Sequence, residues 1–180
     1  MSAHAALKAA TRDAHDRLDA QFSAYDLSKR EDYARFLQAH AAAYLPVETA
    51  LGEAGAANII PQWQENRRSA ALIEDIEALG LQLPPPARAP AFDSPAAIIG
   101  GAYVLEGSRL GAKLIKRDVD PTFPSAFLNS KSGLGWKNFV TLIERVLPTP
   151  LEGEQAQRSA IDTFGVFERA AAEGPGTVSV

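Results

Sequence analysis

Helical periodicity, with almost no strand pattern to compete with it, is the feature that most limits how this chain can fold. Alanine, the residue with the highest helix propensity, recurs throughout, and alternating runs of β-branched residues are nearly absent. Apolar residues follow helical spacing at about 3–24, from 28 to beyond 47, and at 61–79, 94–116, 136–147 and 150–172. The sequence therefore predicts an all-α, multi-helix bundle.

Local signals mark several boundaries of these helices. Ser28, with Glu31 three residues later, has the form of a capping box. Ser94, followed by proline, has the form of an N-cap with Pro at the first helical position. Pro46 is expected to kink or divide the second helix. The proline-rich stretch 83–90 predicts a surface loop.

The length of 180 residues fits one domain, and the 46% of hydrophobic and 22% of charged residues are ordinary for a globular protein. We find no internal repeat, which argues against a solenoid. We expect a helical domain over residues 1–173, followed by a frayed C-terminal tail at 174–180 that contains two glycines and a proline.

Composition also excludes several classes of function. The chain has no cysteine, which excludes a disulfide scaffold, a thiolate metal site and a cysteine nucleophile. A formal charge of −4 and the lack of a long basic run argue against nucleic acid as a partner. There is no apolar run long enough for a membrane span and no signal-type leader. We therefore expect a cytoplasmic protein.

The fourth predicted helix carries four glycines, at 100, 101, 107 and 111. Each costs about 0.5–1 kcal/mol relative to alanine in a helix, so some close approach should compensate for them. On a helical projection Gly100, Gly107 and Gly111 fall within roughly 40° of one another and form a bare stripe of backbone. Such a stripe accepts either a neighbouring helix at close range or a flat ligand.

The first predicted helix carries a histidine at the edge of its apolar face. His15 follows Lys8 by seven residues, so the two side chains project from nearly the same face, roughly 10 Å apart along the axis. An imidazole and an ammonium so placed would suit a haem, which carries iron at its centre and anionic propionates at one edge. The alternative is a core-edge histidine with a satisfied hydrogen bond and a solvated lysine.

Taken together, the two helices resemble those of bacterial haem oxygenases, the biliverdin-producing superfamily, and most closely its short branch found beside bacterial phytochromes. The pattern Leu7-Lys8-x-x-Thr11-x-x-x-His15-x-x-Leu18 resembles the proximal signature of that family. The run Gly101-Ala-Tyr-Val-Leu-Glu-Gly-Ser-Arg-Leu-Gly111 resembles its kinked distal helix. Weaker similarity extends through 67–80, 136–139 and 164–168, so the resemblance covers most of the chain.

The resemblance implies roles for individual residues. His15 would be the axial ligand and the sole protein ligand of the iron. Gly107 and Gly111 would let the distal backbone lie directly over the porphyrin. Lys8 would pair with a propionate, and Lys137 is a second candidate for that role. The matched motifs also place Thr11, Tyr103 and Val104 among the residues expected to contact haem.

The reaction that the resemblance implies is oxidative cleavage of haem, which serves as both cofactor and substrate. Dioxygen is consumed, and biliverdin, carbon monoxide and ferrous iron are released. Electrons would come from an external ferredoxin or reductase, since the chain has no flavin or nicotinamide fingerprint. A bilin-accepting phytochrome is a further partner that the resemblance implies, and no metal other than the haem iron is expected.

One departure from the family pattern concerns Ser108. Better-known members carry an aspartate there, which anchors the waters that deliver protons; a serine hydroxyl can hold a water but carries no charge. This departure favours an alternative, a non-catalytic haem carrier or sensor with the same pocket. A third reading is a helical interaction module whose glycines merely seat a neighbouring helix.

Other charged residues carry weaker expectations. Glu106 is expected to be a solvated or salt-bridged carboxylate, and Arg67 and Arg68 to lie at the surface or to pair between helices. The basic C-terminal half of the fourth helix fits the negative end of the helix dipole and an acidic electron donor. Its basic residues are Arg109, Lys113, Lys116 and Arg117.

Overall fold

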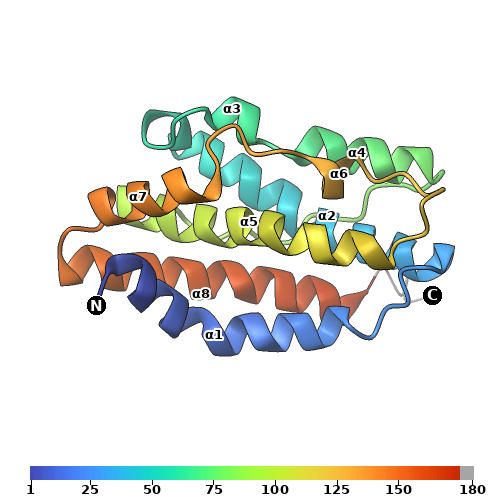
Figure 1. Ribbon diagram of the computed structural model, residues 1–180, viewed down its shortest axis with the longest axis horizontal. Helices are drawn as coiled ribbons and strands as arrows, with labels where there is room; N and C mark the ends of the chain where they lie inside the picture. The colour runs from blue at the N-terminus through green and yellow to red at the C-terminus, as the bar shows by residue number, and fades with distance from the viewer. Residues whose placement is uncertain (175–180) are drawn as a thin grey trace.

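The computed structural model of the chain describes residues 1–174, whose regular elements are all helical (Figure 1). In chain order these are α1 (Ala3–Phe22), α2 (Arg30–Glu53), the 3₁₀ helix η1 (Ala56–Asn58), α3 (Trp63–Asn66), α4 (Ser69–Ala78), α5 (Pro95–Ile115), the 3₁₀ helix η2 (Lys116–Asp118), α6 (Ala126–Asn129), α7 (Trp136–Val146) and α8 (Pro150–Glu173). No strand occurs in this part of the chain, and the predicted all-α fold is confirmed. Of the predicted tail, residues 175–180 lie outside the described residues.

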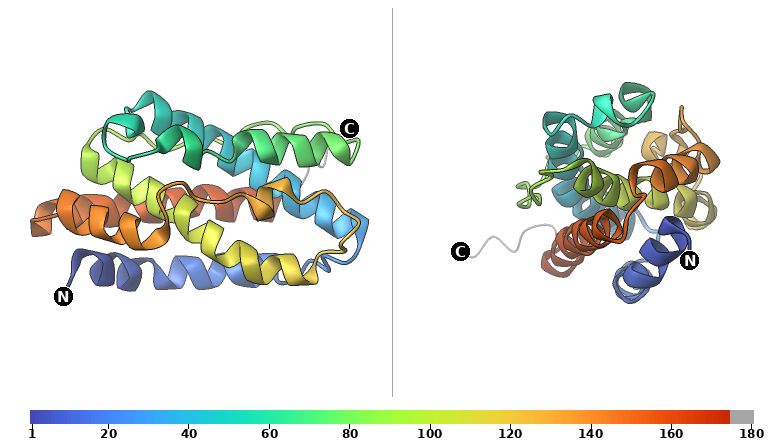
Figure 2. Two further views of the ribbon diagram at one scale, coloured as in Figure 1. Left: turned by 45° about the horizontal axis from the view of Figure 1, so that its top comes forward. Right: turned by 90° about the vertical axis from the view of Figure 1, so that its left-hand side faces the viewer.

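Helix α8 lies at the centre of the contacts between the long helices of the bundle. The longest helices, α1, α2 and α5, all pack along α8, and α7 lies against both α5 and α1 (Figures 1 and 2). Helix α4 covers α2 on the far side of the molecule from α1 (Figure 1). The largest buried side chains of α2, which include Tyr33, Phe36 and Tyr44, fill the space within this frame.

Several predicted boundaries are confirmed and one capping motif is wrong. Ser94 caps α5, and its hydroxyl accepts a hydrogen bond from the amide of Ala97. Ser28 does not cap α2, because the helix begins later, at Arg30, with Lys29 at the N-cap position and no side-chain cap. The Ser28 hydroxyl donates to Asp26 at 2.6 Å. Pro46 lies inside α2, which continues on both sides of it and is not divided.

The predicted third helix is two helices in the structure. The helical conformation is interrupted between α3 and α4. There the backbone amides of Arg68 and Ser69 donate to the buried carboxylate of Glu48 at 2.9 and 3.1 Å. A carboxylate in this position satisfies free amides at the start of a helix and favours a new N-terminus there. Helix α6 was not predicted. Asp75 supports its start in the same way, accepting from the amides of Ala126 and Phe127.

Among the described residues, no helix is both long enough and apolar enough to span a lipid bilayer.

Candidate functional site

The four glycines of α5 divide into two pairs with different surroundings. A Cβ atom added to Gly100 would lie 2.2 Å from the carbonyl oxygen of Ala156 on α8, and one added to Gly101 would lie 2.4 Å from the ring of Phe92. At Gly107 and Gly111 an added Cβ would meet no heavy atom within 4 Å. The prediction that Gly100 belongs to a bare stripe is therefore wrong, because α8 covers it. Gly107 and Gly111 do form a bare strip, and no neighbouring helix is seated on it.

Tyr103 shows which element the bare strip faces. It lies one helical turn before Gly107, and its ring centroid is 6.3 Å from that of His4 on α1. Burial raises the pKa of Tyr103, and a hydrogen bond with the Thr11 side chain opposes that rise. Helices α1 and α5 run in the same direction, and the second half of α5 lies beside α1 in both views of Figure 2. His15 follows Thr11 on α1, and Gly107 follows Tyr103 on α5, each by four residues or about one helical turn, so we infer that the parallel helices bring His15 and Gly107 to about the same level.

The side chain of His15 is exposed, with 59% of its surface accessible to solvent. Its Nδ1 atom lies 3.3 Å from Oδ2 of Asp19 and 3.7 Å from Oδ1 of Asp16. Its ring packs edge-on against Phe164 of α8, with the centroids 6.1 Å apart. A carboxylate beside Nδ1 favours the tautomer with the proton on that nitrogen and leaves Nε2 free to bind a metal. His15 is thus an accessible imidazole beside two carboxylates, and not a histidine buried in the core.

The other predicted haem contacts lie at different depths. Thr11 is buried, and its hydroxyl donates to the carbonyl of Leu7 at 2.9 Å. Val104 is 5% exposed and belongs to the apolar core, so it supports α5 from behind. Lys8 and Lys137 are exposed. Lys137 follows Trp136, whose ring contacts Tyr103, and therefore lies at the end of the site where α1, α5 and α7 meet.

His4 is a contact residue of this end of the molecule that no sequence pattern indicated. Its ring packs against both Tyr103 and Trp136, with centroids 6.3 and 5.7 Å away. Its backbone amide and that of Ala3 donate to the carboxylate of Glu144 on α7, at 2.9 and 3.0 Å. These contacts anchor the start of α1, and since the partners are more than 90 residues away, no local pattern could have indicated them.

Arg68 is the second residue that sequence reasoning missed. It was expected at the surface or in an interhelical pair, but it is 1% exposed, and its guanidinium has no carboxylate within 4 Å among the described residues. Its Nη1 atom donates to the hydroxyl of Ser108 at 3.0 Å, and Nη2 donates to the carbonyl of Phe127 at 3.0 Å. Arg67 does pair between helices, with Nε 3.4 Å from a carboxylate oxygen of Glu48.

Glu106 and Arg109 form a buried pair behind the bare strip. Oε2 of Glu106 lies 3.5 Å from Nε of Arg109, which confirms a salt-bridged carboxylate. Burial raises the pKa of Glu106, and the charge of Arg109 opposes the rise. Arg109 also donates to the carbonyl of Ser130 at 3.2 Å, so its charge is not part of the exposed basic surface. That surface consists of Lys113, Lys116 and Arg117.

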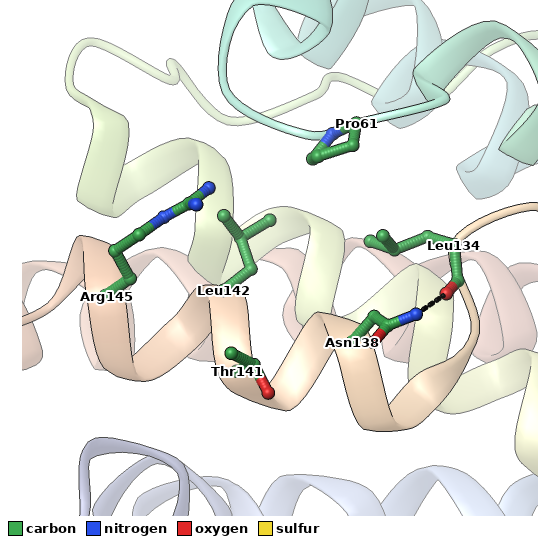
Figure 3. Close-up of a pocket in the computed structure, with 6 residues that line it drawn as sticks. All are labelled: Pro61, Leu134, Asn138, Thr141, Leu142 and Arg145. Carbon is green, nitrogen blue, oxygen red and sulfur yellow. Dashed lines mark hydrogen bonds between the residues drawn. The ribbon is translucent and has the colours of Figure 1, made fainter.

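A separate hollow lies on the face of α7 that points away from α1 (Figure 3). The residues that line it are Pro61, Leu134, Asn138, Thr141, Leu142 and Arg145. The side-chain amide of Asn138, a polar group that lines the hollow, donates to the carbonyl of Leu134 at 2.9 Å and so already has a partner (Figure 3). This hollow contains none of the predicted site residues.

Two curated proteins show what the sequence is similar to. A haem oxygenase of Xanthomonas campestris is 30% identical over 148 residues, which cover 76% of this chain and 87% of that protein. The haem oxygenase PigA of Pseudomonas aeruginosa is 26% identical over 168 residues, which cover 87% of this chain and 85% of that protein. No family model matches the sequence.

Solved structures agree on the fold. The haem oxygenase of Neisseria meningitidis, solved with nitric oxide and carbon monoxide bound, superposes with a TM-score of 0.79 at 22% identity, covering 100% of this chain and 99% of that one. The haem oxygenase of Leptospira interrogans superposes with a TM-score of 0.73 at 16% identity, covering 96% of this chain and 100% of that one. The all-α arrangement seen here is therefore the arrangement of these enzymes.

Proposed function

Because this chain belongs to the haem oxygenase family, and is an enzyme of haem degradation, we propose that haem binds between α1 and the second half of α5, with His15 as the ligand of the iron. The observation that carries the proposal is the bare strip at Gly107 and Gly111, which faces α1 at the level of an accessible imidazole. A flat ring fits against backbone that carries no side chain. The relatives favour an enzyme over a non-catalytic carrier with the same pocket.

On the proximal side, Asp19 orients the ligand. Its carboxylate lies 3.3 Å from Nδ1 of His15, favours the proton on that nitrogen and would leave Nε2 free for the iron. Hydrogen bonding to the far nitrogen also makes an imidazole a stronger donor to a metal. Phe164 provides an apolar surface beside the ring and excludes water from that side.

On the distal side, Gly107 and Gly111 provide a wall without side chains. Bound haem supplies the iron that activates dioxygen and is itself the ring that is cleaved, to biliverdin, carbon monoxide and ferrous iron. The bare backbone lets the porphyrin approach closely and offers no side-chain base above it. The Ser108 hydroxyl donates to the carbonyl of Leu105 at 2.8 Å, and can accept a hydrogen bond from a water molecule.

The remaining site residues hold the edges of the porphyrin. We assign Lys8 and Lys137 to the propionates, because both ammonium groups are exposed near the end of the site where α1 meets α7. Tyr103 and Thr11 close the same end through their contact between α1 and α5. Val104 fixes the first half of α5 from the core. Haem is the one prosthetic group of this proposal; among residues 1–174 no three His, Asp or Glu side chains gather to hold another metal.

We assign the docking site of the external electron donor to the exposed basic surface formed by Lys113, Lys116 and Arg117. This surface lies at the end of α5 and in η2, next to the proposed site, and would attract an acidic ferredoxin or reductase. Reduction of the haem-loaded protein by such a donor should slow steeply as salt concentration rises, whereas reduction by ascorbate should not. A phytochrome that accepts the bilin stays a prediction from the resemblance.

A titration with haemin, followed by addition of reductant, tests the proposed function. Wild-type protein should give the visible spectrum of a histidine-ligated haem, and should then convert it to a verdin with ascorbate or ferredoxin. His15→Ala should lose the axial-ligand spectrum. A stable haem complex that never turns over would contradict the enzymatic part, and no spectral change at all would contradict the site.

A further inference from the structure

The feature that the proposed reaction leaves unexplained is the buried charge of Arg68. The side chain is 1% exposed, and no carboxylate of the described residues lies within 4 Å of it. Its hydrogen bonds go to neutral groups, the Ser108 hydroxyl, the Phe127 carbonyl and the side chain of Tyr44, and its Nε atom has no partner. Burying a cation without a counter-ion is costly, and such groups are rare unless they serve a purpose.

Aromatic rings take the place of a counter-ion. The guanidinium carbon lies 3.9 Å from the centroid of the Phe127 ring and 5.4 Å from that of Tyr44. The faces of these rings attract a cation and offset part of the cost of removing it from water. Burial lowers the pKa of Arg68, but a guanidinium still keeps its proton in a protein at neutral pH. The position therefore carries a full positive charge.

Glu48 holds Arg68 in place without neutralising it. The carboxylate accepts from the backbone amide of Arg68 at 2.9 Å, and from the amide and hydroxyl of Ser69. The negative charge of Glu48 interacts with the backbone amides at the start of α4 and with the exposed side chain of Arg67, whose Nε atom lies 3.4 Å from Oε1 of Glu48. The guanidinium thus points away from Glu48 and toward α5, and the surrounding core prevents it from swinging out to solvent.

The charge lies directly behind the distal wall. Ser108, which accepts from Nη1, is adjacent to Gly107 on the bare strip. The hydroxyl proton of Ser108 is engaged by the carbonyl of Leu105, so the serine carries no charge of its own and the charge of Arg68 acts past it through space. The other charges nearby, on Glu106 and Arg109, face each other at 3.5 Å and largely cancel.

Resting on the haem site proposed above, we infer that Arg68 is an electrostatic positioning residue of the distal side: its charge, acting through space past Ser108, makes the site prefer an anionic ligand on the iron over a neutral one. The positive group thus comes from the residue that precedes α4 and lies behind the distal wall of the site. Oxygen that gains negative charge during reduction would be held by the same field.

The test compares one anionic and one neutral ligand on the haem-loaded protein. Azide is titrated into the ferric form and carbon monoxide into the ferrous form of wild type, Arg68→Met and Arg67→Met. A unit charge about 10 Å away, at an effective dielectric constant of about 20, changes the affinity for an anion roughly tenfold. Arg68→Met should therefore bind azide roughly tenfold more weakly and carbon monoxide nearly unchanged. Arg67→Met removes the same charge from an exposed neighbour and should leave both affinities unchanged.

A second pair of variants decides the matter if Arg68→Met does not fold. Ser108→Asp places a carboxylate against the guanidinium and should lower azide affinity by a similar factor, while Ser108→Asn, its neutral counterpart, should not. Unchanged azide affinity in Arg68→Met or Ser108→Asp, or a parallel loss of both ligands, would overturn the inference. A wild-type protein that binds haem normally keeps the proposed site intact in either case, whereas failure to bind haem would contradict the site itself.

Discussion

Gly100 and Gly111 are both helical glycines of α5, yet an added methyl group would meet different surroundings at the two positions. At Gly100 it would collide with the backbone of Ala156 at 2.2 Å, an atom that cannot move aside cheaply. At Gly111, as at Gly107, it would project into open space. The first glycine is needed for packing, and we propose that the other two are needed for a ligand.

Alanine substitutions should separate these two requirements. In the haem-free protein, Gly107→Ala and Gly111→Ala should each raise the free energy of unfolding by about 0.5–1 kcal/mol, because alanine favours a helix. Gly100→Ala should lower it by about 1–3 kcal/mol through overpacking against α8. Urea unfolding measures all three, and haemin affinity should fall in the first two variants. A loss of stability in Gly111→Ala would show that the strip is packed against protein after all.

His40 makes stability depend on pH. Its ring is buried and stacked on Phe22 at 4.5 Å, with Nδ1 bound to the carbonyl of Phe36, and loss of solvation lowers its pKa to about 4. The unfolded chain, with a histidine pKa near 6.5, binds more protons between these values. The free energy of unfolding should therefore fall by up to about 3 kcal/mol as pH drops from about 6.5 to 4. His40→Leu should flatten this part of the profile; an unchanged slope would contradict the assignment.

At the scale of elements, the separation of α3 from α4 depends on Glu48, which lies on α2. Glu48→Gln keeps the shape of the side chain, but its NH₂ group cannot accept from the backbone amides of Arg68 and Ser69. The substitution should lower the free energy of unfolding by about 1–3 kcal/mol. Amide hydrogen exchange in the first turn of α4 should accelerate with it. Glu65→Gln, an exposed glutamate on α3, is the matched control and should change neither measurement.

The same elements show what a sequence can and cannot indicate. The cap residue Ser94 and the apolar periodicity of a helix are local features of the sequence. The start of α5 and the extents of α1 and α7 could therefore be predicted. Ser28 had the right spacing for a cap, but α2 begins at Arg30, so Ser28 lies outside the helix and its hydroxyl donates to Asp26. The break before α4 depends on a carboxylate twenty residues earlier, which no helical pattern can reveal.

For the whole molecule, the site arises because α8 supports both of its walls. Helix α1 is tied to α8 by the pair Arg17–Glu168, at 3.2 Å, and to α7 by Glu144, while α5 packs along α8 through Gly100. The residue types proposed to ligate and cover a haem were visible in the sequence at His15, Gly107 and Gly111. Arg68 was not, because its partners are 40 and 59 residues away and meet it only in the folded core.

Binding of iron by His15, opposite the bare strip of α5, can be tested through the iron–histidine stretching vibration. Resonance Raman spectra of the ferrous, haem-loaded protein should contain this band in wild type. The band should be absent in His15→Ala and should return, as an iron–imidazole band, when free imidazole is added to that variant. An unchanged band in His15→Ala would contradict the account, because another residue would then be the ligand.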